Sequence, residues 1–290
     1  MNLLMIKVLF QKITQDQPIY LIACLALLGT LSGCGGGHGF EPVVTAVKLQ
    51  SLQYGKVATI LVGGKDLRAT LQVDTGGACE NVTISPSSST ELLSFNCRVS
   101  NVGVFALRIF GSTGEVLYTS TLMVPKPQVK LLTSLGDITL ELEPAIAPVT
   151  VNNFLSYVQS SFYAGNLFHR VIPGFVIQGG GYTTGMLKRQ GQMPPIALES
   201  NKGLANSRGT LAMARTSVFN SATSEFFINL VNNTGLDYQS PSSPGYAVFG
   251  AVTEGMAVVD AIAAQPTGPV LGYNDVPLLE STIILAVQVK

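Results

Sequence analysis

The stretch FHRVIPGFVIQGGG, residues 168–181, contains two short β-type runs that flank Pro173-Gly174-Phe175. A two-residue turn at Pro-Gly would place Arg170 opposite Ile177. A three-residue connection with one residue in the left-handed region is the next most common hairpin, and it pairs Arg170 with Gln178 instead. We predict the second geometry, which puts a fixed cation and an amide on one face of a hairpin.

Length and charge limit the classes of protein to which this chain can belong. Its 290 residues are enough for two domains. The 17 basic and 17 acidic residues balance, and only 12% of the residues are charged. Nucleic-acid binding needs a basic patch, so we expect no nucleic-acid partner. The apolar fraction of 47% is that of a packed protein and excludes general disorder.

Residues 1–33 have the features of an export signal. An apolar run at 19–31 follows basic residues and is too short for a spanning helix. It ends at Leu-Ser-Gly-Cys, residues 31–34, which resembles the bacterial lipoprotein signal and implies a lipidated Cys34. A plain signal peptide cut nearby and an uncleaved anchor are the alternatives. The Gly-rich residues 34–39 are predicted to be a tether.

A lipid on Cys34 implies a location in the bacterial cell envelope. We expect the protein to face the periplasm from a membrane to which its lipid anchors it, with the outer membrane favoured over the inner. Each buried CH₂ contributes about 0.8 kcal/mol, so several acyl chains suffice for stable anchoring. The sequence leaves open the membrane leaflet and the true start codon, for which Met5 is a second candidate.

Residues 40–125 have the sequence pattern of a small β domain. Apolar and β-branched runs are separated by Gly, Ser and Asp, without a helical period. The runs are 43–49, 57–62, 71–73, 82–84, 92–95, 104–109 and 116–124. This spacing predicts an immunoglobulin-like β-sandwich. The region has no catalytic constellation, so we expect a spacer or a partner-binding module.

The cysteines indicate one disulfide. Cys24 leaves with the signal and Cys34 takes the lipid, which leaves Cys79 and Cys97 in a domain exposed to an oxidising compartment. We predict a Cys79–Cys97 bridge, which would contribute about 3 kcal/mol on the loop-entropy model. Two buried free thiols are the alternative.

The prolines of Pro125-Lys126-Pro127 separate this region from residues 126–290. Several motifs then follow one another at family spacing: FHR and PGF within 168–175, GTLAMAR at 209–215, SATSEFFIN at 221–229, LD at 236–237 and YAVFG at 246–250. Together they resemble cyclophilin-type peptidyl-prolyl cis-trans isomerases, most of all the exported bacterial branch. The resemblance extends from about residue 129 to residue 290.

The resemblance implies a mainly β fold, a closed eight-stranded antiparallel barrel capped by two helices. The residues agree: 129–133 and 137–142 read as a hairpin, and apolar residues at helical spacing follow Thr150, a candidate N-cap. The second helix is expected at 255–264, where Pro266 ends it, and the last strand at 282–289.

The family's site is carried over motif by motif. Arg170 becomes the catalytic arginine, and Gln178 holds it and binds substrate backbone. Phe175, Val176, Met213, Phe227 and Leu236 are expected to line a proline pocket, and Ala214 and Arg215 to offer backbone groups to the peptide. His169 is interpreted as structural, because isomerisation needs no general base.

Three residues depart from the family pattern. Gly235 replaces a tryptophan that many eukaryotic members use to bind cyclosporin, and Tyr246 replaces the usual histidine at the substrate site. Glu225 replaces the usual glutamine. Its carboxylate would either pair with Arg170 or face the substrate residues before the proline; we predict the second, since Gln178 occupies the arginine.

The resemblance implies an enzyme that acts on proline-containing polypeptides, as a monomer and without cofactor or metal. A surface peptide-binding module with weak or no isomerase activity is the alternative. The intact set of Arg170, Phe175, Gln178 and Phe227 favours the enzyme, since a binder has less need of the arginine. The clients, the role of residues 40–125 and the sensitivity to cyclosporin are not readable from the sequence.

Overall fold

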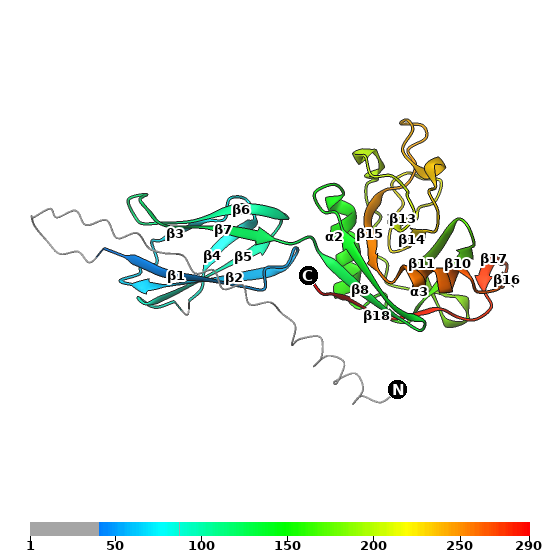
Figure 1. Cartoon of the computed structure of the whole chain (residues 1–290), viewed down its shortest axis with the longest axis horizontal. Coiled ribbons are helices and arrows are strands. Elements are labelled where there is room, and N and C mark those ends of the chain that lie inside the picture. Colours follow the sequence, from blue (N-terminus) through cyan, green and yellow to red (C-terminus); the bar gives the residue numbers. More distant parts are fainter. Residues whose placement is uncertain (1–40, 87) are drawn as a thin grey trace, which may run out of the picture. The chain divides into compact units, whose positions relative to one another are not determined.

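The computed structural model describes residues 41–86 and 88–290 (Figure 1). The chain divides into two compact units between Pro125 and Lys126. The predicted signal peptide, the lipidated Cys34 and the Gly-rich tether lie outside the described residues. Within the described ranges, no helix is long and apolar enough to cross a membrane.

The N-terminal unit consists of two antiparallel sheets. Its strands are β1 (Val43–Gln50), β2 (Val57–Lys65), β3 (Gln72–Asp74), β4 (Cys79–Ile84), β5 (Leu92–Val99), β6 (Gly103–Phe110) and β7 (Val116–Val124). One sheet has the order β1-β2-β5-β4 and the other the order β3-β6-β7. Each strand overlaps one of the seven runs predicted from the sequence.

Side-chain alternation builds the core of this unit. In β5 the side chains of Leu93, Phe95, Cys97 and Val99 are buried, while those between them are more exposed. The period of two is that of a strand with one face on a core. These residues share one apolar cluster with residues from both sheets, such as Ile109 of β6.

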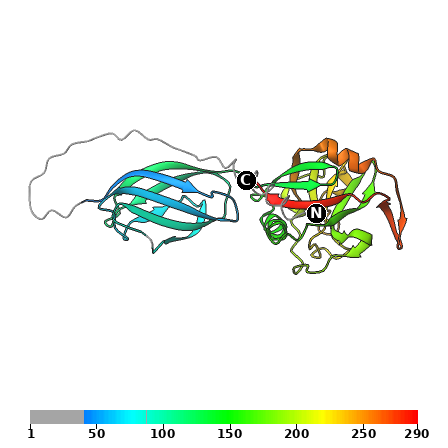
Figure 2. The same ribbon diagram turned by 90° about the horizontal axis from the view of Figure 1, so that it is seen from below.

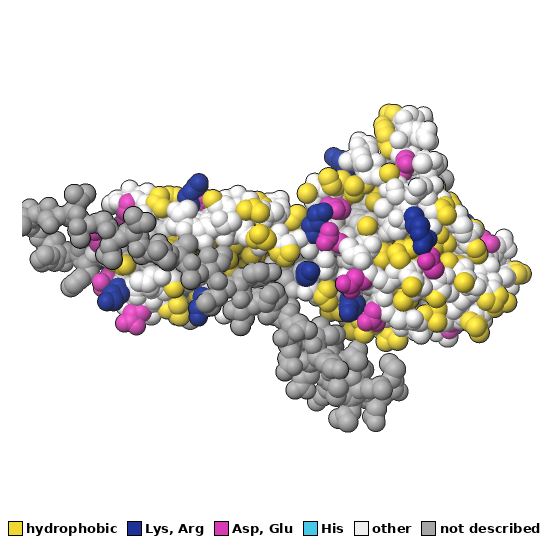
Figure 3. Space-filling model, in the orientation of Figure 1, with side chains coloured by type: hydrophobic (Ala, Val, Ile, Leu, Met, Phe, Trp, Pro, Cys, Tyr) yellow, Lys and Arg dark blue, Asp and Glu magenta, His cyan; other side chains and the backbone are white. Residues whose placement is uncertain are grey.

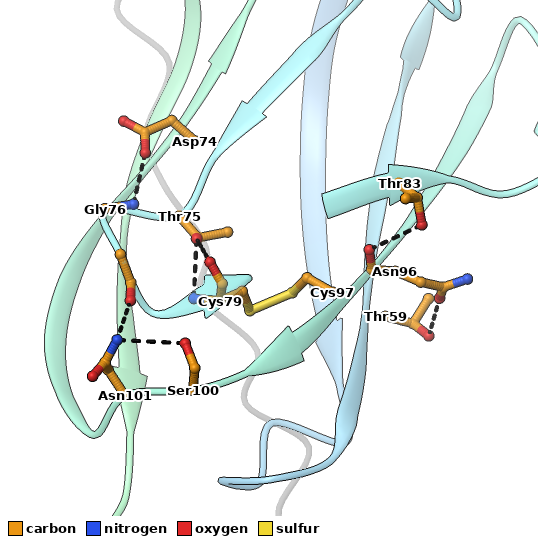
Figure 4. The surroundings of a disulfide bond; sticks show 11 residues. Thr59, Asp74, Thr75, Gly76, Cys79, Thr83, Asn96, Cys97, Ser100 and Asn101 are labelled. Carbon is orange, nitrogen blue, oxygen red and sulfur yellow. Dashed lines mark hydrogen bonds between the residues drawn. A yellow bond between two sulfur atoms is a disulfide. The ribbon is translucent and has the colours of Figure 1, made fainter. Parts of the chain in front are cut away.

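The predicted disulfide is present and joins β4 to β5 (Figure 4). The Cα atoms of Cys79 and Cys97 are 5.6 Å apart. Because β4 and β5 are neighbours, the bond links two strands of one sheet rather than the two sheets. Beside it, the Thr75 hydroxyl accepts the Cys79 N–H at 3.2 Å, so the loop entering β4 is fixed at its end.

The C-terminal unit is a closed barrel with two helices. Its strands are β8 (Gln128–Thr133), β9 (Gly136–Leu142), β10 (Asn166–Ile172), β11 (Val176–Thr183), β12 (Leu187–Lys188), β13 (Thr210–Met213), β14 (Phe226–Asn229), β15 (Val248–Glu254), β16 (Thr267–Val270), β17 (Tyr273–Pro277) and β18 (Thr282–Gln288). Eight of them close in the order β10-β18-β8-β9-β15-β13-β14-β11, because β11 pairs again with β10. The predicted eight-stranded antiparallel barrel is therefore confirmed.

The helices α2 (Pro148–Gln159) and α3 (Met256–Ala263) lie on opposite sides of the barrel (Figures 1 and 2). In the core, the ring of Phe154 lies 5.2 Å from that of Tyr163, 5.5 Å from that of Phe226 and 5.3 Å from that of Phe249. Such pairs add to the free energy of area burial. The amphipathic pattern at 151–158 thus places α2 on the barrel interior.

The expectation that Thr150 caps α2 is wrong. The helix begins earlier, with Ala147 as N-cap and Pro148 in the first turn. The free N–H groups are instead satisfied by a distant carboxylate: Thr150 N–H and hydroxyl each donate to Glu199 Oε2 at 2.8 Å. A negative charge at a helix N-terminus also interacts favourably with the helix dipole. No short-range capping pattern could reveal a cap from residue 199.

The hairpin β16–β17 was not predicted from the sequence. It forms a separate two-stranded sheet outside the barrel, between α3 and β18. Leu271 and Gly272 form its turn, and both have positive φ, 49° and 84°. The stretch contains prolines and glycine in place of an alternating pattern, so period-two reasoning has little to detect.

Candidate active site

The hairpin of β10 and β11 has the predicted register. Ile172 pairs with Val176 and Arg170 with Gln178, so three residues connect the strands. Gly174 in this connection has φ of 72°, in the left-handed region that a residue without Cβ adopts at little cost. The geometry that brings the arginine and the amide together is therefore confirmed.

A chain of polar contacts leads from Arg170 into the barrel wall. Arg170 Nη1 donates to Gln178 Oε1 at 3.4 Å, and Gln178 Nε2 donates to Glu225 Oε2 at 2.8 Å. The same carboxylate oxygen lies 3.3 Å from His169 Nε2. Glu225 therefore interacts with Gln178 and His169 and makes no ion pair with Arg170, as the favoured sequence hypothesis requires.

Glu225 remains ionised in this setting. Its partial burial acts to raise the pKa of the carboxyl group, but the hydrogen bond and the charge of His169 act to lower it. The hydrogen bond from Gln178 and the charge of Lys188 act in the same direction, and the pKa of Glu225 lies below its ordinary value. At neutral pH the site thus contains a carboxylate beside the amide that contacts the arginine.

His169 has a structural environment, as predicted, but its partner was missed. The side chain is 5% exposed, and its ring lies 4.6 Å from that of Tyr182. Nδ1 has no hydrogen-bond partner among the described residues. Its contact with Glu225 joins residues 56 positions apart in the chain, and the sequence signal for it was the replacement of glutamine by glutamate at 225.

The guanidinium of Arg170 retains free donors. Its Nε lies 3.9 Å from Asp275 Oδ2 of β17, a partly exposed pair of the kind that contributes about 0–1 kcal/mol. An arginine has five N–H donors. Within the part of the chain that the structure describes, no hydrogen-bond acceptor engages Nη2 of Arg170.

A pocket lies directly beside the guanidinium. It is lined by Arg170, Phe175, Val176, Gln178, Ala214, Arg215, Phe227, Leu236 and Tyr246. Its volume is about 140 Å³. A cavity of about 150 Å³ lined by apolar side chains holds benzene, so a five-membered pyrrolidine ring fits here.

Met213 was predicted to line the pocket but is not among the residues that line it. Its side chain is 1% exposed, and it pairs across the strands with Phe226, whereas its neighbour Ala212 pairs with Phe227. Successive residues of a strand face opposite sides. Ala212 and Phe227 belong to the cluster at the pocket, and Met213 therefore lies on the other face of β13.

Tyr246 and Arg215 also line the pocket, and they contact each other. The ring of Tyr246 lies 5.5 Å from that of Phe227 in an edge-on arrangement, and the Arg215 guanidinium lies 4.7 Å from the Tyr246 ring. Arg215 Nε and Nη2 also donate to the Gly245 carbonyl at 3.0 and 2.9 Å. The side chain of Arg215 is thus fixed by this loop and by a cation–π contact.

The backbone beside the pocket has fewer free groups than expected. The Ala214 N–H donates to the Glu225 carbonyl at 2.9 Å, so only its carbonyl is available to a peptide. Among the described residues, neither the N–H nor the C=O of Arg215 forms a hydrogen bond. The predicted backbone contacts are therefore possible at Arg215 and at one group of Ala214.

A second hollow adjoins the pocket and contains Glu225. The two share Gln178, Ala214 and Arg215 in their walls, and the second adds Lys188, Gln192, Thr216, Ser221, Thr223 and Glu225. Lys188 here was not singled out from the sequence, because its strand β12 lies outside the recognised motifs.

Comparison with known proteins decides the family. Residues 128–289 match the model of the family described as cyclophilin type peptidyl-prolyl cis-trans isomerase/CLD. The chain belongs to this family. The matched residues are the C-terminal unit, so this cyclophilin-type isomerase carries its catalytic machinery on the barrel.

Curated relatives of this cyclophilin-type isomerase include bacterial proteins. A peptidyl-prolyl cis-trans isomerase of Acinetobacter baylyi is 51% identical over 162 residues, which cover 56% of this chain and 85% of the relative. Peptidyl-prolyl cis-trans isomerase B of Escherichia coli is 48% identical over 160 residues, which cover 54% of this chain and 96% of the relative. These relatives match the barrel and leave the N-terminal unit unmatched.

Among solved structures, a cyclophilin-type isomerase of Cryptosporidium parvum is 26% identical to this chain. The match covers 56% of this chain and 97% of the other, with a TM-score of 0.47.

Proposed function

We propose that this cyclophilin-type isomerase catalyses rotation of X-Pro bonds in exported polypeptides, with Arg170 stabilising the twisted transition state. The observation that carries the proposal is the position of the Arg170 guanidinium at a pocket of about 140 Å³ with polar and apolar walls, with Nη1 on Gln178 and Nη2 unengaged by any described residue. The pocket walls of Phe175, Phe227 and Leu236 hold the proline ring.

The chemistry explains why so few polar groups suffice. Amide resonance sets a barrier of about 18–20 kcal/mol to rotation of a peptide bond. When the bond twists, the prolyl nitrogen becomes pyramidal and regains a lone pair that can accept a hydrogen bond. A guanidinium directed at that nitrogen stabilises the twisted state more than the planar one, and only such differential binding increases the rate.

Gln178 orients the arginine, and the side chains that line the pocket hold the substrate. Gln178 fixes the orientation of the Arg170 guanidinium, because the Gln178 amide is itself fixed by a hydrogen bond to Glu225. Phe227 and Tyr246 keep the ring still while the carbonyl before the proline turns. The free groups of Arg215 and Ala214 align the peptide backbone, and Glu225 faces the residues that precede the proline.

We further propose that this activity is located in the cell envelope. Lipidation of Cys34 anchors the protein to a membrane, outer rather than inner, on the periplasmic side. The disulfide of Cys79 and Cys97 supports an oxidising compartment. Four- and three-stranded sheets in the order found here correspond to the A-B-E-D and C-F-G arrangement of constant-type immunoglobulin domains, which supports an immunoglobulin-like spacer or partner-binding module.

The disulfide differs from the usual immunoglobulin pattern. In antibody domains the bridge joins the two sheets between the second and sixth strands. Here it joins the fourth and fifth strands of a single sheet. The proposed immunoglobulin-like assignment therefore rests on strand order and on the shared core, not on the cysteines.

Isomerisation of an Ala-Pro tetrapeptide by the full chain tests the catalytic proposal. Arg170→Ala is expected to lower kcat/KM by about tenfold to a hundredfold, because a hydrogen bond to a charged group contributes about 1.5–3 kcal/mol. Arg170→Lys keeps the charge without the planar fork and is expected to recover only part of the loss. Wild-type activity in Arg170→Ala would refute the proposed role.

A further inference from the structure

The hairpin β16–β17 exposes an unusual amount of apolar surface. Leu271 is 75% exposed, Leu279 66%, Leu278 59% and Tyr273 43%. We call these four side chains the hairpin surface. Figure 3 shows hydrophobic side chains gathered at the end of the C-terminal unit that carries this hairpin. Large apolar side chains gathered on a protein surface are typical of interaction sites.

A hollow opens beside the hairpin surface. It is lined by Leu167, Phe168, His169, Gly185, Met186, Val270, Val276, Pro277, Leu278 and Glu280, and its volume is about 160 Å³. This volume is close to that of an apolar cavity that holds one benzene molecule. One large apolar side chain therefore fits, with the exposed Leu278 at the rim connecting the hollow to the hairpin surface.

The hairpin lies beside the proline site. Strand β10 borders both hollows, which share no lining residue: Phe168 and His169 line the one beside the hairpin, and Arg170 lines the proline pocket. From the other side, Asp275 of β17 lies 3.9 Å from Arg170 Nε. A polypeptide with its proline at Arg170 thus has the hairpin surface as a neighbour.

The hairpin is fixed to the barrel rather than hanging free. The hydroxyl groups of Tyr182 and Tyr273 form a hydrogen bond at 3.2 Å, and the Glu280 carboxylate accepts the Gly185 N–H at 2.8 Å. Burial and the hydrogen bond to Tyr273 raise the pKa of Tyr182 to about 12, so its hydroxyl stays protonated at neutral pH. The ring of Tyr273 and the segment at Glu280 are therefore fixed to the barrel before any partner binds, which lowers the entropy cost of binding.

We propose that the hairpin surface and its hollow bind an apolar segment of the polypeptide substrate, beyond the residues that flank the isomerised proline. The proposal rests on catalysis at Arg170, as inferred above. It adds a second point of attachment that favours long unfolded chains over short peptides.

Two other occupants fit the observations less well. An anionic membrane attracts basic segments, but residues 267–289 contain no Lys or Arg and do contain Asp275 and Glu280. A second copy of the chain would cover the leucines, but the position of Asp275 of the hairpin 3.9 Å from Arg170 favours an occupant that also reaches the site at Arg170.

The test compares two substrates on the full chain. One is an Ala-Pro tetrapeptide without large apolar side chains, and the other is an unfolded protein whose refolding is limited by X-Pro isomerisation. The variant Leu271→Asn with Leu279→Ser removes exposed apolar groups, and Asn tolerates the positive φ of 49° at position 271. The control, Val149→Ser with Ile284→Thr, removes exposed apolar groups elsewhere on the same unit.

The hairpin variant is expected to keep wild-type kcat/KM on the tetrapeptide and to lose about tenfold on the unfolded protein, mainly through KM. The control pair is expected to lose nothing on either substrate. Equal activity of hairpin variant and control on the unfolded protein would overturn the proposal. So would a wild-type dimer that the hairpin variant abolishes in sedimentation, or wild-type binding to phosphatidylcholine vesicles that requires the same leucines.

Failure of the catalytic proposal has a different signature. If Arg170→Ala keeps full activity on the tetrapeptide, the position of the active site is wrong, whatever the hairpin variant does. If Arg170→Ala is inactive on both substrates and the hairpin variant is unaffected on both, the inference about the hairpin surface alone is wrong.

Discussion

Gln178 Nε2 donates a hydrogen bond to Glu225 Oε2 at 2.8 Å, and this contact sets the direction in which the Gln178 amide faces. An ionised carboxylate can only accept hydrogen bonds, so the NH₂ group of Gln178 must face Glu225. The Gln178 carbonyl is then left for Arg170 Nη1, which lies 3.4 Å away. A carboxylate at 225 thus selects the amide orientation that suits a cation.

Removing the side chain of Glu225 should lower kcat, whereas a glutamine at this position should preserve it. In Glu225→Ala the Gln178 amide loses its fixed partner, and a hydrogen bond of this kind contributes about 1 kcal/mol, which corresponds to roughly fivefold. We expect kcat on a neutral Ala-Pro peptide to fall by about that factor with little change in KM. Glu225→Gln can still accept from Gln178 and should stay near the wild-type rate. Equal kcat for all three proteins would contradict this positioning role.

Glu225 should also impose a preference for charge before the proline. Its carboxylate is partly exposed in the hollow beside the proline pocket, and a pair of this kind contributes about 1 kcal/mol at most, or roughly fivefold. Peptides with Lys shortly before Ala-Pro should be turned over faster than those with Glu, more so at low salt. Glu225→Gln should erase the difference. Lys188→Gln should increase it, because Lys188 lies in the same hollow and competes for the carboxylate.

The pH dependence of this preference has a defined sign. The pKa of Glu225 lies below its ordinary value of 4.5, so the carboxylate is ionised throughout the neutral range. The ratio of Lys-peptide to Glu-peptide rates should therefore be constant between pH 6 and 8. It should be lost only as the pH falls below that ordinary value, where the carboxylate is protonated. A ratio that changes between pH 6 and 8 would assign the preference to another group.

Cyclosporin should bind weakly. Gly235 lies in the exposed 3₁₀ turn Thr234–Leu236 and supplies neither an indole donor nor a flat apolar surface. Loss of an anchor of that kind costs about 2 kcal/mol or more, roughly thirtyfold in affinity. A Cβ at this position would meet no atom within 4 Å, so Gly235→Trp is compatible with the fold and should recover affinity. Nanomolar inhibition of the unmodified protein would refute the prediction.

Mass spectrometry should show directly which cysteine is lipidated and which two form a disulfide. Intact-mass analysis of membrane-extracted protein should find acyl chains on Cys34 and no free thiol at Cys79 or Cys97. Alkylation of either sandwich cysteine should require a reductant. A mature N-terminus well away from residue 34, or ready alkylation without reductant, would remove the basis for the proposed location.

The sequence predicted elements best where one local pattern determines them. Turn chemistry reduced the hairpin register to two alternatives, and the observed pairing of Arg170 with Gln178 and the left-handed Gly174 confirm the one predicted. The family motifs located the barrel. The same reasoning misplaced Met213, because a motif places a residue near a site while strand alternation decides its face.

The features that were missed depend on contacts distant in sequence. Glu199 caps a helix that begins about fifty residues earlier, and Asp275 reaches Arg170 from a hairpin without strand alternation. The contact of His169 with Glu225 is of the same kind. Such pairs arise only when the barrel closes, so no window of the sequence contains both partners.

The central claim is that Arg170 acts in the transition state and not in ground-state binding. The most direct measurement is the cis–trans exchange rate of an Ala-Pro peptide bound to the enzyme, obtained by NMR exchange spectroscopy together with the Kd. For Arg170→Ala we predict an on-enzyme rate lower by about tenfold to a hundredfold and a Kd within about twofold of the wild type. A Kd that weakens by the full factor while the on-enzyme rate stays unchanged would contradict the account.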